Sequence, residues 1–363
     1  MNKEVISSKQ GYAMIMMFLI GSAIVLSQGV QAKQDVWLAY IFAMAIAVPV
    51  NLIYARLLAI FPGMDLFDIV REIFGKVTGS IISLLYMWYA FHLGSLVMRN
   101  FSEFIQIISL QETPQYAIVA ILGAFCIWYV KAGIEVMARW ARFVSVIVLI
   151  VLMSIAALSL KEADFSNLQP FLYNGIQPVI SSAYSIFSFP FGETIIFTMI
   201  FCKVKNKFNV YKVFLVGILL AAFILIVASI RNIIVLGMGT LDMLNFPSYA
   251  AVGLINIGHF LQRIEVVISV VFLLTGIVKI GVCLSAVCNG ANKVFGLRGP
   301  LPIVAPICFL MMNLSCIIYS NTMEMLEWAS EVYQYYAFPF QIILPILIWI
   351  CGEFHRRKKR KRA

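Results

Sequence analysis

Four ionisable side chains stand inside long apolar stretches of this sequence. Arg99 and Glu103 are four residues apart, and Glu193 and Lys279 lie in two later stretches. If these stretches cross a bilayer, each charge costs about 2.5–3.5 kcal/mol at its centre, so each needs a partner or a function. A spacing of four places Arg99 and Glu103 on one helix face, as a structural ion pair or as part of a gate. Glu193 has Arg99 or Lys279 as candidate partner, and it either anchors its segment or belongs to a site.

Two of the apolar stretches are interrupted near their middle by residues that weaken a helix. One contains Gly21, Ser22 and Ala23, and the other contains Pro190 and Gly192. Proline removes a backbone donor, and glycine permits unusual dihedral angles. Either pattern alone indicates close packing or a kink. Together they favour a binding site, because freed backbone groups are tolerated at membrane depth only inside protein or along a cavity. An amino acid offers a carboxylate to freed N–H groups and an ammonium to freed carbonyls.

The composition requires lipid as the solvent for most of the chain. Of its 363 residues 62% are hydrophobic and 12% are charged, and the mean hydropathy is +0.94. A soluble domain is about 45–50% apolar and about 25% charged. These values exclude a soluble enzyme, a disulfide-rich secreted domain and a disordered chain. A membrane-embedded enzyme is disfavoured too, since the apolar stretches lack an HExxH motif, a phosphate-binding glycine loop, clustered histidines and paired aspartates.

Ten stretches are long and apolar enough to span a bilayer, which needs about 20 residues of helix. We therefore predict an all-α integral membrane protein with a single transmembrane domain over 1–363. Interrupted helices in first and sixth place favour a five-plus-five inverted repeat, with repeat 1 at about 10–160 and repeat 2 at about 177–353. The predicted spans are 11–30, 37–61, 80–106, 115–131, 141–160, 178–202, 211–236, 264–288, 301–320 and 338–353. A short surface helix is expected near 66–74, and a short outer helix or lid within 237–263.

The distribution of charge predicts the orientation. The net charge is +10, and most Lys and Arg fall in alternate loops and in the basic tail 354–363. The positive-inside rule then places both termini in the cytoplasm. Beside a membrane the tail indicates contact with anionic lipid rather than nucleic acid, for which no recognition module is present. The seven cysteines read as small core residues, and the three scattered histidines form no metal site. No cofactor is predicted.

The chain resembles the B subunits of spore germinant receptors, a family within the amino acid–polyamine–organocation transporter superfamily. The similarity extends over essentially the whole chain. The motifs that carry it are residues 189–193 with 195–197, residues 260–265 after 246–249, and residues 20–23. The sequence departs from the family pattern after the first of its breaks, because residues 26–28 lack the proline often found there.

The resemblance implies a nutrient-sensing subunit in the inner membrane of a bacterial spore, with its termini on the spore-core side. It would bind a small germinant, an amino acid in our interpretation, between helices 1 and 6 and signal to A- and C-type partner subunits. An amino acid permease of the same superfamily is the alternative, and only the family signatures favour the receptor. The expected substrate-binding residues are Gly21, Ser22, Ala23, Tyr89, Phe189, Pro190, Phe191, Gly192 and Thr275. The expected polar network or gate comprises Arg99, Glu103, Glu193, Arg263, Glu265 and Lys279.

Several of these assignments have a simpler alternative. In related transporters an aromatic residue of helix 3 closes over the substrate, which favours Tyr89, whereas packing is the other role. The Thr275 hydroxyl could instead bond to its own helix. Arg263 and Glu265 could form a loop clasp at a helix end. Lys279 lies on helix 8, which in the superfamily helps to form an ion site, so its ammonium replaces a sodium ion or simply pairs with Glu193.

Overall fold

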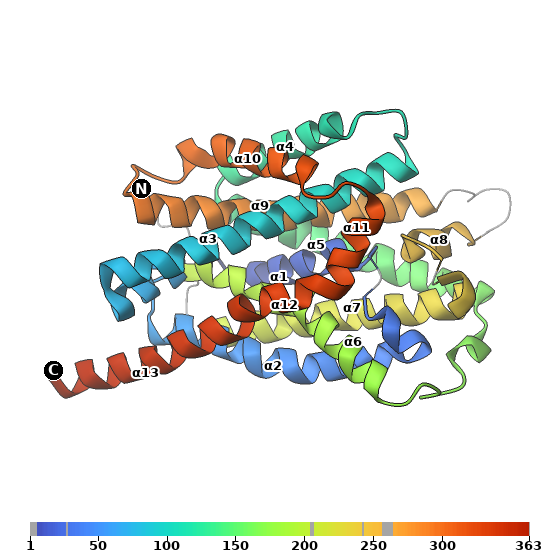
Figure 1. Ribbon diagram of the computed structural model, residues 1–363, viewed down its shortest axis with the longest axis horizontal. Coiled ribbons are helices and arrows are strands. Elements are labelled where there is room, and N and C mark those ends of the chain that lie inside the picture. Colours follow the sequence, from blue (N-terminus) through green and yellow to red (C-terminus); the bar gives the residue numbers. More distant parts are fainter. Residues whose placement is uncertain (1–5, 27, 204–206, 242, 256–263, 363) are drawn as a thin grey trace.

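The computed structural model describes residues 6–26, 28–203, 207–241, 243–255 and 264–362. The secondary-structure elements in these residues are all helices, as the apolar stretches predicted (Figure 1). The first half contains α1 (Ser8–Ala23), η1 (Val30–Asp35), α2 (Val36–Ile60), α3 (Leu66–Ile108), α4 (Gln115–Lys131), α5 (Ile134–Ser159), η2 (Leu160–Glu162) and η3 (Phe165–Leu168). The second contains α6 (Gln177–Ser188), η4 (Phe191–Met199), η5 (Phe201–Lys203), α7 (Lys207–Leu241), α8 (Pro247–Gly253), α9 (Glu265–Phe295), η6 (Leu301–Ile303), α10 (Val304–Ile317), α11 (Thr322–Glu327), η7 (Trp328–Val332), α12 (Tyr333–Phe338), η8 (Pro339–Ile343) and α13 (Leu344–Arg362).

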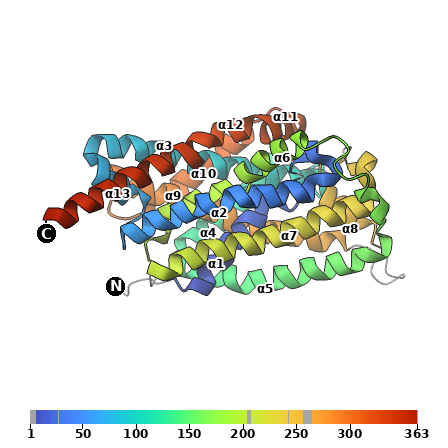
Figure 2. The same ribbon diagram turned by 90° about the horizontal axis from the view of Figure 1, so that it is seen from below.

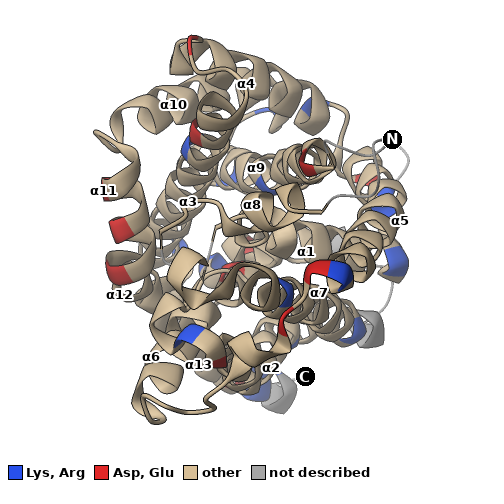
Figure 3. Ribbon diagram, turned by 90° about the vertical axis from the view of Figure 1, so that its right-hand side faces the viewer, with Lys and Arg blue, Asp and Glu red and all other residues tan. Residues whose placement is uncertain are grey.

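The long helices run side by side in one bundle (Figures 1 and 2). The start of α3 and the end of α13 lie at one end of the bundle, and α8 lies at the other. Seen from the α8 end, α1 and α9 are surrounded by the other helices (Figure 3). Every described residue from 13 to 26 is buried, so α1 has no exposed face after its first turns. A helix that is apolar on all sides is expected at such a central position.

Within the described residues, seven helices are long and apolar enough to cross a membrane, and two shorter apolar helices accompany them. The seven are Val30–Ile60, Leu66–Ile108, Ile134–Glu162, Gln177–Met199, Val210–Leu241, Glu265–Phe295 and Thr322–Lys359. The shorter two are Gln115–Lys131 and Leu301–Ile317. The predicted surface helix forms the first part of α3 and is set off by Gly75, whose φ of 79° breaks the helical path. The outer helix expected within 237–263 is α8, although residues 256–263 lie outside the described part.

The last predicted span, 338–353, was too short. The helix begins at Thr322 and continues to the basic tail. The segment between the last two predicted spans contains the acidic residues Glu324, Glu327 and Glu331, which are typical of a loop. In the structure these three side chains lie on the exposed face of a helix, while Met325 and Tyr333 of the same segment pack inward. A helix with one exposed face and one buried face accommodates such charges on its exposed face. Two single-turn π segments, η7 and η8, interrupt it.

Candidate functional site

The break in helix 6 lies at the Phe-Pro pair. α6 ends at Ser188, and Phe189 is extended (φ −133°, ψ 108°). Proline disfavours the α conformation in the residue before it and donates no backbone hydrogen bond, which explains why the helix stops there. After Pro190 the chain resumes as the 3₁₀ helix η4 rather than as an α-helix. The segment carrying Phe191, Gly192 and Glu193 is therefore displaced from the regular helical path, and all three residues are buried.

The first helix ends at the small residues identified in the sequence. α1 ends at Ala23, so the predicted span 11–30 is a helix only in its first part. A Cβ at Gly21 would lie 3.2 Å from Cδ of Lys279 and 3.5 Å from its Cβ. The missing side chain at Gly21 therefore gives Lys279 its room. The next residue, Ser22, is buried, and its hydroxyl has no hydrogen-bond partner in the described structure.

Glu193 pairs with Lys279, one of the two partners considered. Lys279 Nζ lies 2.6 Å from Glu193 Oε2, and both side chains are 0% exposed. The same Nζ lies 4.7 Å from the ring centroid of Phe189 and 5.1 Å from that of Phe18. A cation over an aromatic face is attracted by the ring quadrupole. The ion pair thus joins the interrupted helix 6 to α9 immediately beside α1.

A chain of hydrogen bonds ends on the same carboxylate. The Tyr333 hydroxyl donates to Glu193 Oε1 at 2.9 Å. Because a carboxylate can only accept, Tyr333 has used its hydrogen, and the Tyr89 hydroxyl must donate across the 3.1 Å contact with Tyr333. Gln341 Nε2 in turn donates to the Tyr89 hydroxyl at 2.9 Å. The donors from α3, α12 and η8 therefore all point toward the negative charge.

Gln341 closes the other side of the helix-6 break. Its Nε2 also donates to the Ser188 carbonyl at 2.8 Å, which satisfies a backbone group freed by the break. Tyr54 of α2 donates to the Gln341 carbonyl at 2.5 Å. A Cβ at Gly192 would lie 2.2 Å from Gln341 Oε1. Gly21 is thus packed against the Lys279 side chain, and Gly192 against the Gln341 side chain.

Two small pockets lie near the ends of α1 and α6. The pocket beside the helix-6 break has about 20 Å³ of water-accessible space and includes Phe189, Glu193 and Tyr333 in its wall; we call it the Glu193 pocket. The pocket beyond the end of α1 has about 40 Å³ of water-accessible space and includes Ala23; we call it the Lys33 pocket. The rest of the Glu193 pocket is Leu93, Leu96, Val97, Asn100, Tyr319, Met325, Trp328 and Ala329.

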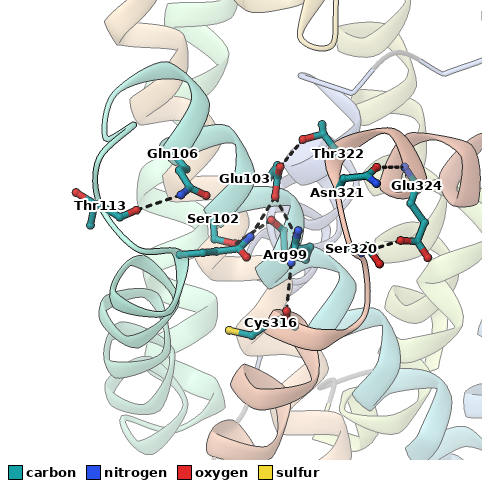
Figure 4. Close-up of polar contacts among 12 residues, drawn as sticks. Arg99, Ser102, Glu103, Gln106, Thr113, Cys316, Ser320, Asn321, Thr322 and Glu324 are labelled. Carbon is teal, nitrogen blue, oxygen red and sulfur yellow. Dashed lines mark hydrogen bonds and ion pairs between the residues drawn. The ribbon is translucent and has the colours of Figure 1, made fainter.

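Arg99 and Glu103 form the predicted ion pair, with Nε 3.0 Å from Oε2 (Figure 4). Arg99 also donates to the Cys316 carbonyl at 3.4 Å. Glu103 accepts a hydrogen bond from Gln115 at 3.1 Å and another from the Thr322 hydroxyl. The cluster ties α3 to the start of α4 and to the loop that leads into α11.

The other predicted site residues take no part in the hydrogen bonds around Glu193, or they lie outside the residues that the structure describes. Thr275 is buried, and its hydroxyl donates to the Val271 and Phe272 carbonyls at 2.9 and 2.8 Å, which is the simpler alternative stated above. Glu265 is the first residue of α9, and Arg263 lies outside the described residues. The described part of the chain contains no cluster of His, Cys, Asp or Glu that could hold a metal ion.

Tyr333 and Gln341 were missed by the sequence analysis. Tyr333 fell in the presumed outer loop, and Gln341 was passed over within an apolar span. A lone amide in a membrane helix is a usable signal, because it must find a partner there. The π segments, which often mark functional sites, have no comparable signature in the sequence.

Comparison with known proteins decides the family. A family model described as "Spore germination protein" matches residues 5–324. The chain belongs to this family of spore germination proteins. Spore germination protein KB of Bacillus subtilis is 27% identical over 99% of this chain and 98% of its own length. Spore germination protein YndE of the same organism is 24% identical over 90% of this chain and 89% of its own. The resemblance stated from the motifs is thereby confirmed.

Solved structures show which fold this spore germination protein adopts. The transporter Mhp1 of the nucleobase-cation-symport-1 family, in a closed conformation with bromovinylhydantoin bound, matches with a TM-score of 0.58. The match covers 98% of this chain and 91% of Mhp1, at 15% identity. An inward-facing structure of Mhp1 matches with a TM-score of 0.55 over 89% of this chain and 74% of that one. The spore germination protein is therefore a multi-pass membrane protein with a transporter-like fold.

Proposed function

We propose that this protein is the germinant-sensing subunit of a spore germination receptor and binds a small amino acid in the Glu193 pocket. The observation that carries the proposal is a buried carboxylate in the wall of a pocket at the helix-6 break. Phe189 is one of the substrate-binding residues expected from the sequence, Glu193 belongs to the expected polar network, and Tyr89 reaches the pocket through Tyr333. Membership in the germination family supplies the biological process.

The lining of the Glu193 pocket suits a zwitterion with an apolar side chain. Glu193 and the Tyr333 oxygen offer acceptors to an ammonium group. Asn100 also lines the pocket and is 8% exposed, and its amide can donate to a carboxylate. Leu96 and Val97 supply apolar contacts. The water-accessible space in the pocket is about 20 Å³, little more than one water molecule needs, so binding an amino acid requires side chains of the pocket wall to move apart.

The wider architecture is part of the same proposal. Seven long and two shorter apolar helices, together with the buried α1, account for ten membrane crossings in one domain. We assign them to two inverted repeats of five, interrupted at helices 1 and 6, with both termini on the spore-core side of the inner membrane. Ligand binding would shift a conformational equilibrium through differential affinity for two states. A- and C-type receptor subunits would receive the change.

Replacing Glu193 by Gln tests the proposal in spores. The substitution keeps the shape but removes the charge, so the germinant concentration for half-maximal germination is expected to rise at least tenfold. Glu135→Gln is the matched control, because Glu135 forms an exposed ion pair with Arg139. An unchanged dose–response curve for Glu193→Gln, at equal protein levels, would refute the assigned site.

An amino acid permease is the second candidate, favoured by the similarity to the Mhp1 transporter. Uptake by proteoliposomes containing this chain alone separates the two functions. The receptor proposal predicts saturable binding without accumulation of labelled amino acid. Net accumulation would favour the permease.

A further inference from the structure

The second pocket stands beside a buried cation that has no carboxylate partner. Arg231 of α7 is 4% exposed. Among the described residues its side-chain partner is Asn232, whose Oδ1 lies 3.2 Å from Nε and 2.6 Å from Nη2. Every other deeply buried charge described above, on Arg99, Glu103, Glu193 or Lys279, is paired with an opposite charge. A buried guanidinium with only an amide partner retains an unbalanced positive field.

Hydrogen bonds carry the influence of this cation into the Lys33 pocket. Because arginine can only donate, Asn232 must turn its Oδ1 toward Arg231 and its Nδ2 toward Ser248. Asn232 Nδ2 donates to Ser248 Oγ at 3.0 Å, and both residues line the pocket. The oxygen of Ser248 is thus used as an acceptor, and its hydroxyl hydrogen remains available as a donor. The chain of hydrogen bonds from Arg231 through Asn232 to Ser248 therefore ends at the pocket wall with the Ser248 hydroxyl as a donor.

The rest of the Lys33 pocket has the same electrostatic character. Lys33 contributes a second positive charge, and its side chain is exposed. Among the described residues that line the pocket none is acidic. The nearby carboxylate of Asp35 accepts the backbone N–H of Leu172 instead. Apolar residues complete the wall, among them Leu26, Leu225 and Ile233.

We propose that the Lys33 pocket is a binding site for a small organic carboxylate, distinct from the Glu193 pocket. The carboxylate accepts the Ser248 hydroxyl and pairs with Lys33, its short apolar part contacts the aliphatic wall, and Arg231 supplies a fixed positive field. A hydrogen bond to a charged group is stronger than one between neutral groups, so the polarised Arg231–Asn232–Ser248 row favours an anion over a neutral molecule of the same shape.

Equilibrium dialysis of the purified full chain in detergent with labelled propionate tests the site. Saturable binding of one propionate per chain is expected, displaced by unlabelled propionate but not by the neutral propionamide. Arg231→Met is expected to abolish it, and Ser248→Ala to weaken it about tenfold, which corresponds to about 1.4 kcal/mol. Ser315→Ala is the matched control, since that buried hydroxyl donates only to the Met312 carbonyl of its own helix. If Arg231→Met does not fold, Ser248→Ala and Lys33→Gln decide.

Glu193→Gln separates this site from the proposed germinant site. It should leave propionate binding unchanged. Absence of saturable binding, or binding that survives both Arg231→Met and Ser248→Ala, would overturn the proposal. Loss of binding in Glu193→Gln with retention in Ser248→Ala would also overturn it and would assign propionate to the Glu193 pocket.

Discussion

Among single residues, Glu193 and Lys279 carry the charges whose burial costs the most free energy unless they are paired. Both side chains are 0% exposed, so neither charge can be hydrated. Removing one partner of a buried pair costs about 3–5 kcal/mol, because the other charge stays buried alone, whereas removing both is often nearly neutral. The pair therefore fixes the two helices that carry it.

Lys279→Met is accordingly expected to destabilise the folded protein by about 3–5 kcal/mol. The double variant Glu193→Gln/Lys279→Met should recover most of this loss, since it leaves no unpaired charge. Thermal unfolding of the purified variants in detergent measures both effects. Additive losses in the double variant would show that the two charges do not interact.

Tyr333→Phe tests the hydrogen-bond chain. The substitution removes the donor to Glu193 and the acceptor for Tyr89, at a cost of about 1–3 kcal/mol. We expect the half-maximal germinant concentration to rise about tenfold with little loss of protein. Tyr335→Phe is the matched control, because Tyr335 is 70% exposed. Equal curves for the two variants would remove Tyr333 from the site.

The sequence was sufficient to identify the charged residues that are expensive to bury in a membrane, but not all of their contacts. Arg99 with Glu103 followed from helical spacing, because spacing along a helix is local information. The choice of Lys279 over Arg99 as partner of Glu193 depends on how α9 packs against helix 6, which no local pattern encodes. Tyr333 and Gln341 were missed because their role arises only when the last helix is folded against the break.

At the scale of elements, the interrupted helices were the most predictable part of the fold. Pro190 ends α6 for a steric reason that acts within two residues of it. By contrast, the 3₁₀ form of η4 and the π segments η7 and η8 depend on tertiary packing. The acidic residues near Thr322 led the sequence analysis to start the last helix too late, because the sequence alone does not show which face of that helix is exposed.

Gly21→Leu tests the interruption in helix 1. A Cβ at this position already approaches Lys279 Cδ to 3.2 Å, so a larger side chain must displace the lysine from Glu193. Loss of germinant response is expected, with the protein still present in the membrane. Gly239→Leu serves as the control, because a Cβ there would meet nothing within 4 Å. A normal response of Gly21→Leu would remove helix 1 from the mechanism.

At the scale of the whole molecule, a transporter-like bundle is combined with a centre closed by side chains. Lys279 packs against Gly21 and Gln341 packs against Gly192, and the Glu193 pocket lies beside the break in helix 6. A built-in ammonium opposite Glu193 supplies a cation at the centre without an ion from solution. This arrangement is consistent with a sensor, in which a bound ligand changes the balance between two packings of the bundle.

The most direct test of the account measures binding in the Glu193 pocket itself. Tritiated alanine, valine and leucine, each in its L form, would be offered to the purified chain and to Leu96→Trp, which fills the pocket with a bulky side chain from its wall. We predict saturable binding of at least one of the three by the wild-type protein and its loss in Leu96→Trp. Binding of none of them, or equal binding by both proteins, would contradict it.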